Sequence, residues 1–333
     1  MSAGERAIAK EMKRQEQEKI RQMKLANKML IPVSKKTELT LELTSFDPNG
    51  VFYLSENRWM KIFKMEGEIN KLVSVVQNLT GRVRITLHMD GDCGRESCHL
   101  SLMETGEMYE DVRQKMIEDE VVLSKAVILH PLDIDEAMNQ IAVNFLKDIR
   151  FSYASYVRGN KDWKREVFQE VKEETKSFTM KDCYGESFHV LAFPTNKVEG
   201  LLKQLMELMC PMYLSIDLNS LTEEEHSDYK RAIEKRYNKR LPVNTEESFI
   251  NLSISAVIIC DSDDARKILE ETILSVFSGH GMVITPSFHM QRKVAESVLS
   301  MGLLDYKIMR NVGLEIAEAM MGGEEDADAK IEV

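Results

Sequence analysis

The stretch Phe249-Ile-Asn-Leu-Ser-Ile-Ser-Ala-Val-Ile-Ile-Cys260 gives the clearest architectural pattern in the chain. Apolar side chains recur at every second position from Ile250 to Cys260, and a β-strand places such positions on one face. The opposite face begins polar and becomes apolar at Val257 and Ile259, so we expect the second half of the strand to be buried on both sides.

The residues after this strand predict a helix and then a second strand. Asp261 is a candidate N-cap for the helix. Apolar residues follow at helical spacing, namely Ala265, Ile268, Leu269, Ile273, Val276 and Phe277. Gly279 is expected to end the helix, residues 282–285 form the next strand, and Pro286 stops it. The order strand, helix, strand indicates an α+β layer.

The same kind of order is predicted in two parts of the chain. Residues 37–130 alternate between strand and helix patterns in the order β-α-β-β-α-β, which is the ferredoxin-like split pattern. Residues 181–303 repeat this order, with a further helix inserted at 221–240. We therefore predict an α+β fold of two tandem ferredoxin-like (βαββαβ) units.

The remaining segments are predicted to be mostly helical. Residues 131–180 are expected to form an all-α insert, with helices at 133–150 and 161–176. Residues 1–36 form a basic helical arm, either a solvated leader or an arm that docks on a partner or an anionic membrane surface. Residues 304–333 give a short helix and an acidic, disordered tail.

Composition limits the classes of function. The 333 residues carry a net charge of −11, which argues against a dedicated nucleic-acid binder, although a local basic patch is compatible with it. The five cysteines suit a reducing compartment, and the N-terminus lacks the apolar core of a secretory signal, so we expect a cytoplasmic protein. The 21 methionines are either core fillers or part of an adaptable contact surface.

Motifs for catalysis or cofactor binding are not found in the sequence. There is no G-x-x-x-x-G-K-[ST], no G-x-G-x-x-G after a strand, no G-x-S-x-G and no H-E-x-x-H. One cluster could be either hairpin turn chemistry or a metal site: Asp90, Asp92, Cys93, Cys98 and His99. A zinc site would need a second ligand pair, so we predict no metal, no cofactor and no catalytic residue.

The helix predicted at 221–240 carries most of the candidate partner-binding residues. Thr222 and Glu225 fit a capping box, and acidic residues come before basic ones, as the helix dipole favours. The basic candidates are Lys230, Arg231, Lys235, Arg236, Lys239 and Arg240. They form either a solvated helix end or, with the strand face of Arg82 and Arg84, a nucleic-acid surface. Trp163 of the insert is a further partner-binding candidate.

Four stretches carry a resemblance to a known family: Gly50-Val-Phe-Tyr-Leu, Arg58-Trp-Met-Lys-Ile-Phe-Lys-Met-Glu-Gly, Phe249-Ile-Asn-Leu-Ser-Ile and Ala295-Glu-Ser-Val-Leu-Ser. Together they resemble the N-terminal domain of the VirB-four/TrbE/CagE class of conjugal-transfer ATPases, especially those of Gram-positive mobile elements. In that family a strand, a sharp turn and K-x-x-x-(E/D)-G open the domain, and a helix like 291–301 closes it. The resemblance covers residues 37–310, and the Walker motifs of the family's motor domain are not present in this chain.

The resemblance implies a non-catalytic scaffold of a type IV secretion machine. Such a module would dock a separate motor ATPase and a small membrane subunit at the cytoplasmic face of the membrane. It would contact the membrane only peripherally or through its partner, and self-association is compatible with it. The alternative is a nucleic-acid-binding protein built from paired ferredoxin-like units. A metal-dependent enzyme at the loop of Cys93 and Cys98 is a third class.

Overall fold

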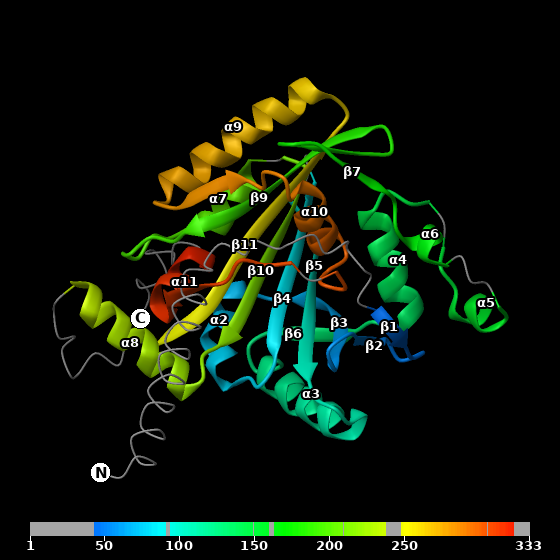
Figure 1. Cartoon of the computed structure of the whole chain (residues 1–333), viewed down its shortest axis with the longest axis horizontal. Coiled ribbons are helices and arrows are strands. Elements are labelled where there is room, and N and C mark those ends of the chain that lie inside the picture. Colours follow the sequence, from blue (N-terminus) through cyan, green and yellow to red (C-terminus); the bar gives the residue numbers. More distant parts are fainter. Residues whose placement is uncertain are drawn as a thin grey trace, which may run out of the picture. The chain divides into compact units, whose positions relative to one another are not determined.

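A single large sheet organises the computed structural model (Figure 1). The residues that the structure describes are 43–90, 94–148, 150–159, 163–208, 210–237, 248–304 and 306–322. All of them belong to the unit that runs from residue 41 to residue 333. Within these ranges thirteen strands join the sheet, and every pairing between them is antiparallel.

The strands are β1 (Leu43–Phe46), β2 (Val51–Leu54), β3 (Arg58–Glu66), β4 (Arg82–Asp90), β5 (Gly94–Thr105), β6 (Ile128–Pro131), β7 (Val171–Glu173), β8 (Phe178–Met180), β9 (Cys183–Ala192), β10 (Met212–Ser220), β11 (Phe249–Cys260), β12 (Val283–Pro286) and β13 (Arg310–Gly313). The helices are α2 (Ile69–Val75), α3 (Tyr109–Leu123), α4 (Ile134–Asn144), α5 (Tyr153–Val157), α6 (Trp163–Val167), α7 (Leu201–Glu207), α8 (Glu223–Tyr237), α9 (Asp263–Gly279), α10 (Gln291–Leu299) and α11 (Leu314–Met321), with a 3₁₀ turn at Val76–Asn78.

Two sets of strands share one spatial order. The first set, from β3 to β6, lies in the order β6-β3-β5-β4, and α2 and α3 connect its strands. The second set, from β9 to β12, lies in the order β12-β9-β11-β10, with α7 and α9 in the connections. β4 and β10 pair along their whole shared length and so join the two sets into one sheet. The predicted α+β class is confirmed, and the structure shows that the strands form one large antiparallel sheet.

The two faces of the sheet differ in chemistry. On the apolar face, alternate residues of β4 and β10 such as Ile85 and Leu214 are fully buried. They belong to a core that includes residues of α2, α3, α7, α9 and α11. On the opposite face, which we call the polar face, a second core lies between α4, α10 and the strands toward β1. The strict alternation of side chains along each strand produces this difference.

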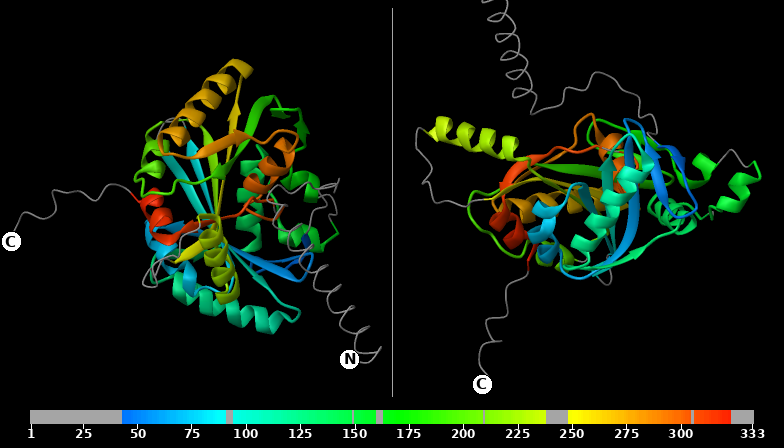
Figure 2. Two further views of the ribbon diagram at one scale, coloured as in Figure 1. Left: turned by 60° about the vertical axis from the view of Figure 1, so that its left-hand side comes forward. Right: turned by 90° about the horizontal axis from the view of Figure 1, so that it is seen from below.

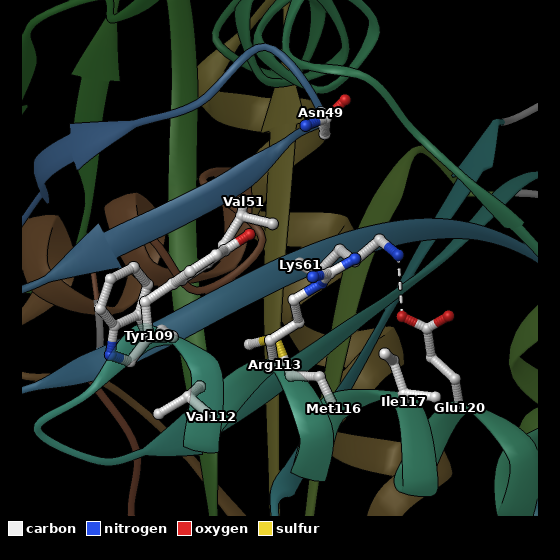
Figure 3. Close-up of a pocket in the computed structure, with 10 residues that line it drawn as sticks. Asn49, Val51, Lys61, Tyr109, Val112, Arg113, Met116, Ile117 and Glu120 are labelled. Carbon is white, nitrogen blue, oxygen red and sulfur yellow. Dashed lines mark hydrogen bonds and ion pairs between the residues drawn. The ribbon is translucent and has the colours of Figure 1, made fainter.

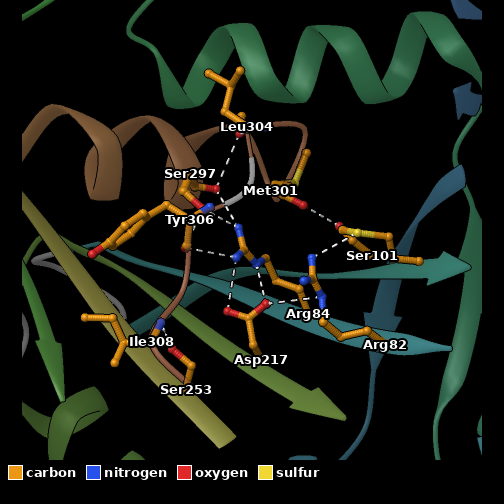
Figure 4. A network of polar contacts seen from close by, with 12 residues as sticks. Arg82, Arg84, Ser101, Asp217, Ser253, Ser297, Met301, Leu304, Tyr306 and Ile308 are labelled. Carbon is orange, nitrogen blue, oxygen red and sulfur yellow. Dashed lines mark hydrogen bonds and ion pairs between the residues drawn. The ribbon is translucent and has the colours of Figure 1, made fainter. Parts of the chain in front are cut away.

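The centre of the polar face is held by a buried ion pair (Figure 4). Arg84 on β4 and Asp217 on β10 are directly opposite in the register. The Arg84 guanidinium donates from Nε to Asp217 Oδ1 at 2.8 Å and from Nη2 to Oδ2 at 3.1 Å. Its Nη1 donates to the carbonyl and hydroxyl oxygens of Ser297 on α10, each at 2.8 Å. One side chain therefore links both strand sets to the helix that covers them.

The segment after α10 closes over this pair. Ser101 on β5 donates its hydroxyl proton to the Met301 carbonyl at 2.7 Å. Gly302 follows with φ of +99°, and a Cβ at this position would lie 3.4 Å from the Arg84 side chain. This distance is an ordinary contact, but a residue other than glycine would be strained by the positive φ. Glycine at residue 302 therefore lets the loop turn over Arg84 without backbone strain.

A row of polar residues crosses the same face. Eight neighbouring strands contribute one residue each to this row, in the spatial order β6-β3-β5-β4-β10-β11-β9-β12. The residues are His130, Lys64, His99, Thr86, Ser215, Ser255, His189 and Thr285. At its centre, Thr86 Oγ1 and Ser215 Oγ are buried and have no hydrogen-bond partner among the described residues. A buried hydroxyl without a partner loses its hydration without replacement, which lowers stability.

The expected all-α insert at 131–180 is wrong in part. A helix forms near 133–150 as α4, and its N-cap Asp133 completes a capping box with Glu136. The helix expected at 161–176 ends at Val167, and β7 and β8 follow it. Val171 lies four residues after Val167 and fits a helix, but it pairs with Met180 in a hairpin that extends the β9 edge. The pairing of β7 with β8, which in turn pairs with β9, prevails over the helical spacing of Val167 and Val171.

Two smaller expectations are also corrected. The N-cap of α9 is Ser262, whose hydroxyl accepts a hydrogen bond from the Ala265 N–H at 3.2 Å, so Asp261 is not the cap. Within the predicted unit at 181–303, the apolar spacing of residues 196–209 indicates a helix, but the helix begins only at Leu201, after Gly200 with φ of +79°. The arm at 1–36 and the tail beyond residue 322 lie outside the described residues.

We predict that Asp217→Asn lowers the free energy of unfolding by about 3–5 kcal/mol, because it leaves the Arg84 charge buried without its counterion. Urea denaturation of the purified protein measures this change. The control is Glu68→Gln, which breaks the exposed Glu68–Lys71 pair and should cost less than about 0.5 kcal/mol. A loss at Asp217 as small as that of the control would contradict the role assigned to the pair.

A matched serine pair tests the unpartnered hydroxyls. Ser215 and Ser101 are both 1% exposed on the same face, but only Ser101 donates a hydrogen bond. We predict that Ser101→Ala loses about 1–2 kcal/mol, whereas Ser215→Ala is neutral or gains up to about 1 kcal/mol. The same denaturation measurement distinguishes them, and equal losses would show that Ser215 has a polar partner in solution.

Candidate binding groove

A groove opens where α3 leaves part of the apolar face uncovered at β2 and β3 (Figure 3). Its volume is about 540 Å³. Its apolar lining comes from both sides: Val51, Trp59, Tyr109, Val112, Met116 and Ile117. A groove of this volume is in the range that accommodates a small molecule or a few side chains of a partner.

Three aromatic rings form a ladder at one end of the groove. Tyr53 and Trp59 are opposite each other in the β2–β3 register, with ring centroids 4.5 Å apart. Trp59 is 5.2 Å from the ring of Tyr109, which opens α3. The Trp59 indole N–H donates to the Gly106 carbonyl at 3.1 Å and so fixes the ring. The ladder presents half-exposed rings held in place before any partner binds.

Charged groups line the other end. Lys61 Nζ donates to Glu120 Oε1 at 2.8 Å across the groove, and both side chains are partly exposed. Arg113 lines the groove beside Lys61, so two cations and one carboxylate are present (Figure 3). The groove therefore combines apolar walls with a small excess of positive charge.

The outer surface of α3 is more apolar than that of a solvated helix. Tyr109 is 38% exposed, Ile117 45% and Val121 58%, and Met108 just before the helix is also exposed. Spacings of eight and four residues place Tyr109, Ile117 and Val121 along one side of the helix. An apolar strip beside a groove marks an interaction surface more often than scattered exposed residues do.

The opposite side of α3 is fixed by a buried carboxylate. Asp119 accepts the backbone N–H of Thr80 at 3.1 Å and that of Gly81 at 2.8 Å. Glu104 at the end of β5 lies beside it and accepts the Thr80 hydroxyl proton at 2.8 Å. The pKa of Glu104 is raised to about 7, mainly by burial and also by the hydrogen bond and charge of Asp119, against the opposing effects of Thr80 and Lys115.

The predicted basic helix is present as α8. The capping box between Thr222 and Glu225 is confirmed, since each backbone N–H donates to the other side chain. Lys230 and Arg231 are described, and Arg231 lies 3.4 Å from Asp228. Figure 2 shows α8 projecting from the sheet. Tyr229 of this helix packs on Phe249 of β11, with ring centroids 4.9 Å apart.

Other basic candidates are only partly described. Lys235 and Arg236 lie in α8, but the structure describes only their backbone, and Lys239 and Arg240 lie outside the described residues. Arg84 is fully buried in its ion pair, so it is not exposed for a nucleic-acid contact. The strand face expected from Arg82 and Arg84 therefore does not form an open basic surface.

Trp163 is a core residue by its position. It is 8% exposed and packs edge-on to Phe46 at 5.4 Å and Phe151 at 6.3 Å. The spacing of Trp163 and Val167 predicts an apolar stripe on a helix, and in α6 this stripe faces the second core. A partner could reach Trp163 only through a rearrangement of this aromatic cluster.

Strand geometry excludes a metal site that uses both Cys98 and His99 as ligands. Cys98 and His99 are consecutive on β5, so their side chains point to opposite faces of the sheet. Cys98 lies in the apolar-face core, while burial and the nearby Lys64 and His88 lower the pKa of His99 to about 4. Asp92 and Cys93 lie outside the described residues. In the part that is described, no three His, Cys, Asp or Glu side chains gather as metal ligands.

The chain matches no protein-family model and no curated protein. Among the described residues, no helix has the length and apolar character needed to cross a membrane.

The groove is the feature that the sequence did not reveal. It joins residues about fifty positions apart, Trp59 and Tyr109, and no local pattern connects them. One signal of the groove was present in the sequence. If residues 106–119 form a helix, its apolar residues fall on more than one side. A helix that covers only one sheet needs a single apolar stripe.

We predict that the stability of the protein falls as pH rises from about 5 to 8, and that Glu104→Gln makes this fall smaller. A carboxyl whose pKa is raised on folding stabilises the protein fully below its unfolded pKa, and this stabilisation is lost as pH rises through about 7. The loss of stability contributed by Glu104 between pH 5 and pH 8 should be at most about 3 kcal/mol, because its pKa is raised from 4.5 to about 7 and one pKa unit corresponds to about 1.4 kcal/mol.

Urea denaturation at several pH values measures this effect. Buried Glu186 has its pKa raised to about 7, mainly by burial, so part of the slope should persist in the variant. Glu110→Gln, at an exposed carboxyl of the same helix, is the control and should leave the slope unchanged. Identical slopes in wild type and Glu104→Gln would show that Glu104 does not titrate in this range.

Proposed function

We propose that this protein is a non-catalytic binding and assembly module that docks partner proteins through the groove beside α3. The observation that carries the proposal is the strip of Tyr109, Ile117 and Val121, exposed along one helix next to an aromatic-lined groove. Exposing this apolar area to water is unfavourable, and contact with a partner would remove the cost.

Within the same proposal, each strand set is a ferredoxin-like unit. The orders β6-β3-β5-β4 and β12-β9-β11-β10, with two connecting helices each, support this assignment. The two units would act as one rigid platform, because β4 and β10 share a continuous ladder and the Arg84–Asp217 pair crosses it. A rigid platform suits a scaffold, since its binding surfaces keep their geometry.

The partners that we propose are those implied by the resemblance to conjugal-transfer ATPases. One is a separate motor ATPase and the other is a small membrane subunit of a type IV secretion machine. The protein would act in the cytoplasm at the inner face of the membrane. Lys61 and Arg113 at the groove favour a partner segment that presents an acidic residue beside apolar ones.

We predict that Ile117→Asp abolishes partner recovery, because it places a charge in the middle of the apolar strip. The tagged protein is purified from its own cells after gentle solubilisation of the membranes, and mass spectrometry identifies the bound proteins. Wild type should recover a Walker-motif ATPase and small membrane proteins. Ile268→Asp is the matched control, because Ile268 is 65% exposed on α9, a different helix from the one that lines the groove.

Two outcomes would contradict the proposal. Equal recovery with both variants would show that the groove is not the docking site. Recovery of nucleic acid that washes off at moderate salt, without such proteins, would favour the alternative function through the basic residues of α8. Thermal denaturation of both variants checks that they are folded.

A further inference from the structure

A pocket on the apolar face lies between α2, α7 and α11, and its volume is about 440 Å³. Helix α11 packs against both α2 and α7. Apolar residues of the three helices and of β4 line the pocket, namely Ile69, Leu87, Leu202, Met206 and Met321. A pocket of this size and lining accommodates a few apolar side chains.

Two groups of opposite charge also line this pocket. Glu68, the N-cap residue of α2, lies on one wall, and Lys203 of α7 lies on another. The Glu68 side chain is 63% exposed, and its pair with Lys71 is a surface ion pair, which contributes little and exchanges readily. Lys203 is exposed as well. The pocket therefore favours a segment that carries a cation and an anion beside apolar residues.

The described part of the chain ends at the rim of this pocket. Gly322 lines the pocket, and its carbonyl accepts the backbone N–H of Gly200, just before α7, at 3.2 Å. Residues 323–333 lie outside the described residues and follow Gly322 directly. Nine residues of extended chain reach about 30 Å, so a turn formed within 323–328 is long enough to bring residue 331 back to the pocket.

The sequence of this segment matches the pocket in polarity and in charge. In Asp326-Ala-Asp-Ala-Lys-Ile-Glu-Val333, charged residues alternate with apolar ones. An extended backbone places Ile331 and Val333 on one side and Lys330 and Glu332 on the other. Ile331 and Val333 are also the two large apolar residues of the sequence after Gly322.

We propose that residues 329–333 of this chain occupy the pocket between α2, α7 and α11. Ile331 and Val333 lie against the apolar lining, and their removal from water drives the binding. The link through residues 323–328 makes the binding intramolecular, so the pocket meets the segment at a high effective concentration. The entropy of closing so short a loop opposes binding only modestly.

The charges determine which occupant is favoured. Lys330 meets Glu68 and Glu332 meets Lys203, so each charged group of the pocket gains a counterion. A purely apolar ligand would leave both pocket charges unused. The site is independent of the groove beside α3 and of the partners proposed for that groove.

Hydrogen exchange of the full chain, followed by mass spectrometry, tests this docking. In wild type the amides of residues 330–333 should exchange at least about tenfold more slowly than their intrinsic rates. The variant Ile331→Asp/Val333→Asp should exchange at the intrinsic rates, because it places two charges against the apolar lining. The matched control is Ala327→Asp, which adds a charge to the same segment outside the docked residues and should keep the protection.

A charge exchange identifies the pocket that holds the segment. Lys203→Glu should reduce the protection several-fold, and Lys203→Glu/Glu332→Lys should restore it. Intrinsic exchange rates in wild type would overturn the proposal, and so would equal protection in Lys203→Glu and wild type. Protection that disappears on dilution would also overturn it, because the segment would then come from a second copy. These variants leave the residues of the groove beside α3 unchanged, so partner recovery is a separate result.

Discussion

The buried pair of Arg84 and Asp217 is the constraint on which the rest of the structure depends. Two charges far from water lower stability unless each compensates the other with good geometry, and here the guanidinium faces the carboxylate with two hydrogen bonds. The pair exists only when β4 and β10 lie in one register, because a shift of one strand by one residue would turn its charged side chain to the apolar face and separate it from its partner. Burying the pair therefore selects one alignment of the two strand sets.

The same pair determines how the polar face is covered. The N–H groups of Arg84 that do not face Asp217 also need acceptors, and Ser297 on α10 supplies both its carbonyl and its hydroxyl to Nη1. The chain then turns over the guanidinium at Gly302, and the Met301 carbonyl is satisfied by Ser101 of β5. Each contact pairs a group that would otherwise be buried without a partner. The hydrogen bonds of Arg84 therefore help to position α10, together with the apolar residues that this helix contributes to the second core.

Elements with a pattern that repeats locally were predictable from the sequence. Features that depend on contacts between distant residues were not. The strand Phe249–Cys260 was predictable because alternation along twelve residues has no helical explanation. Val171 shows the opposite case, because its spacing from Val167 fits a helix, and only the pairing with Met180 beside β9 makes it a strand residue. Ser262 and Asp261 are both good caps, and local geometry decided between them. The groove was not predictable, because its two walls are separate in sequence.

Helix α3 connects the groove to a pair of buried carboxyl groups. Asp119 fixes one side of the helix to the backbone of Thr80 and Gly81, while Tyr109 and Ile117 of the same helix line the groove. A Cβ at residue 81 would lie 2.3 Å from Glu104 Oε1, so the backbone and the two carboxyl groups are in tight contact. A change in the charge of Glu104 therefore acts on the group that positions α3.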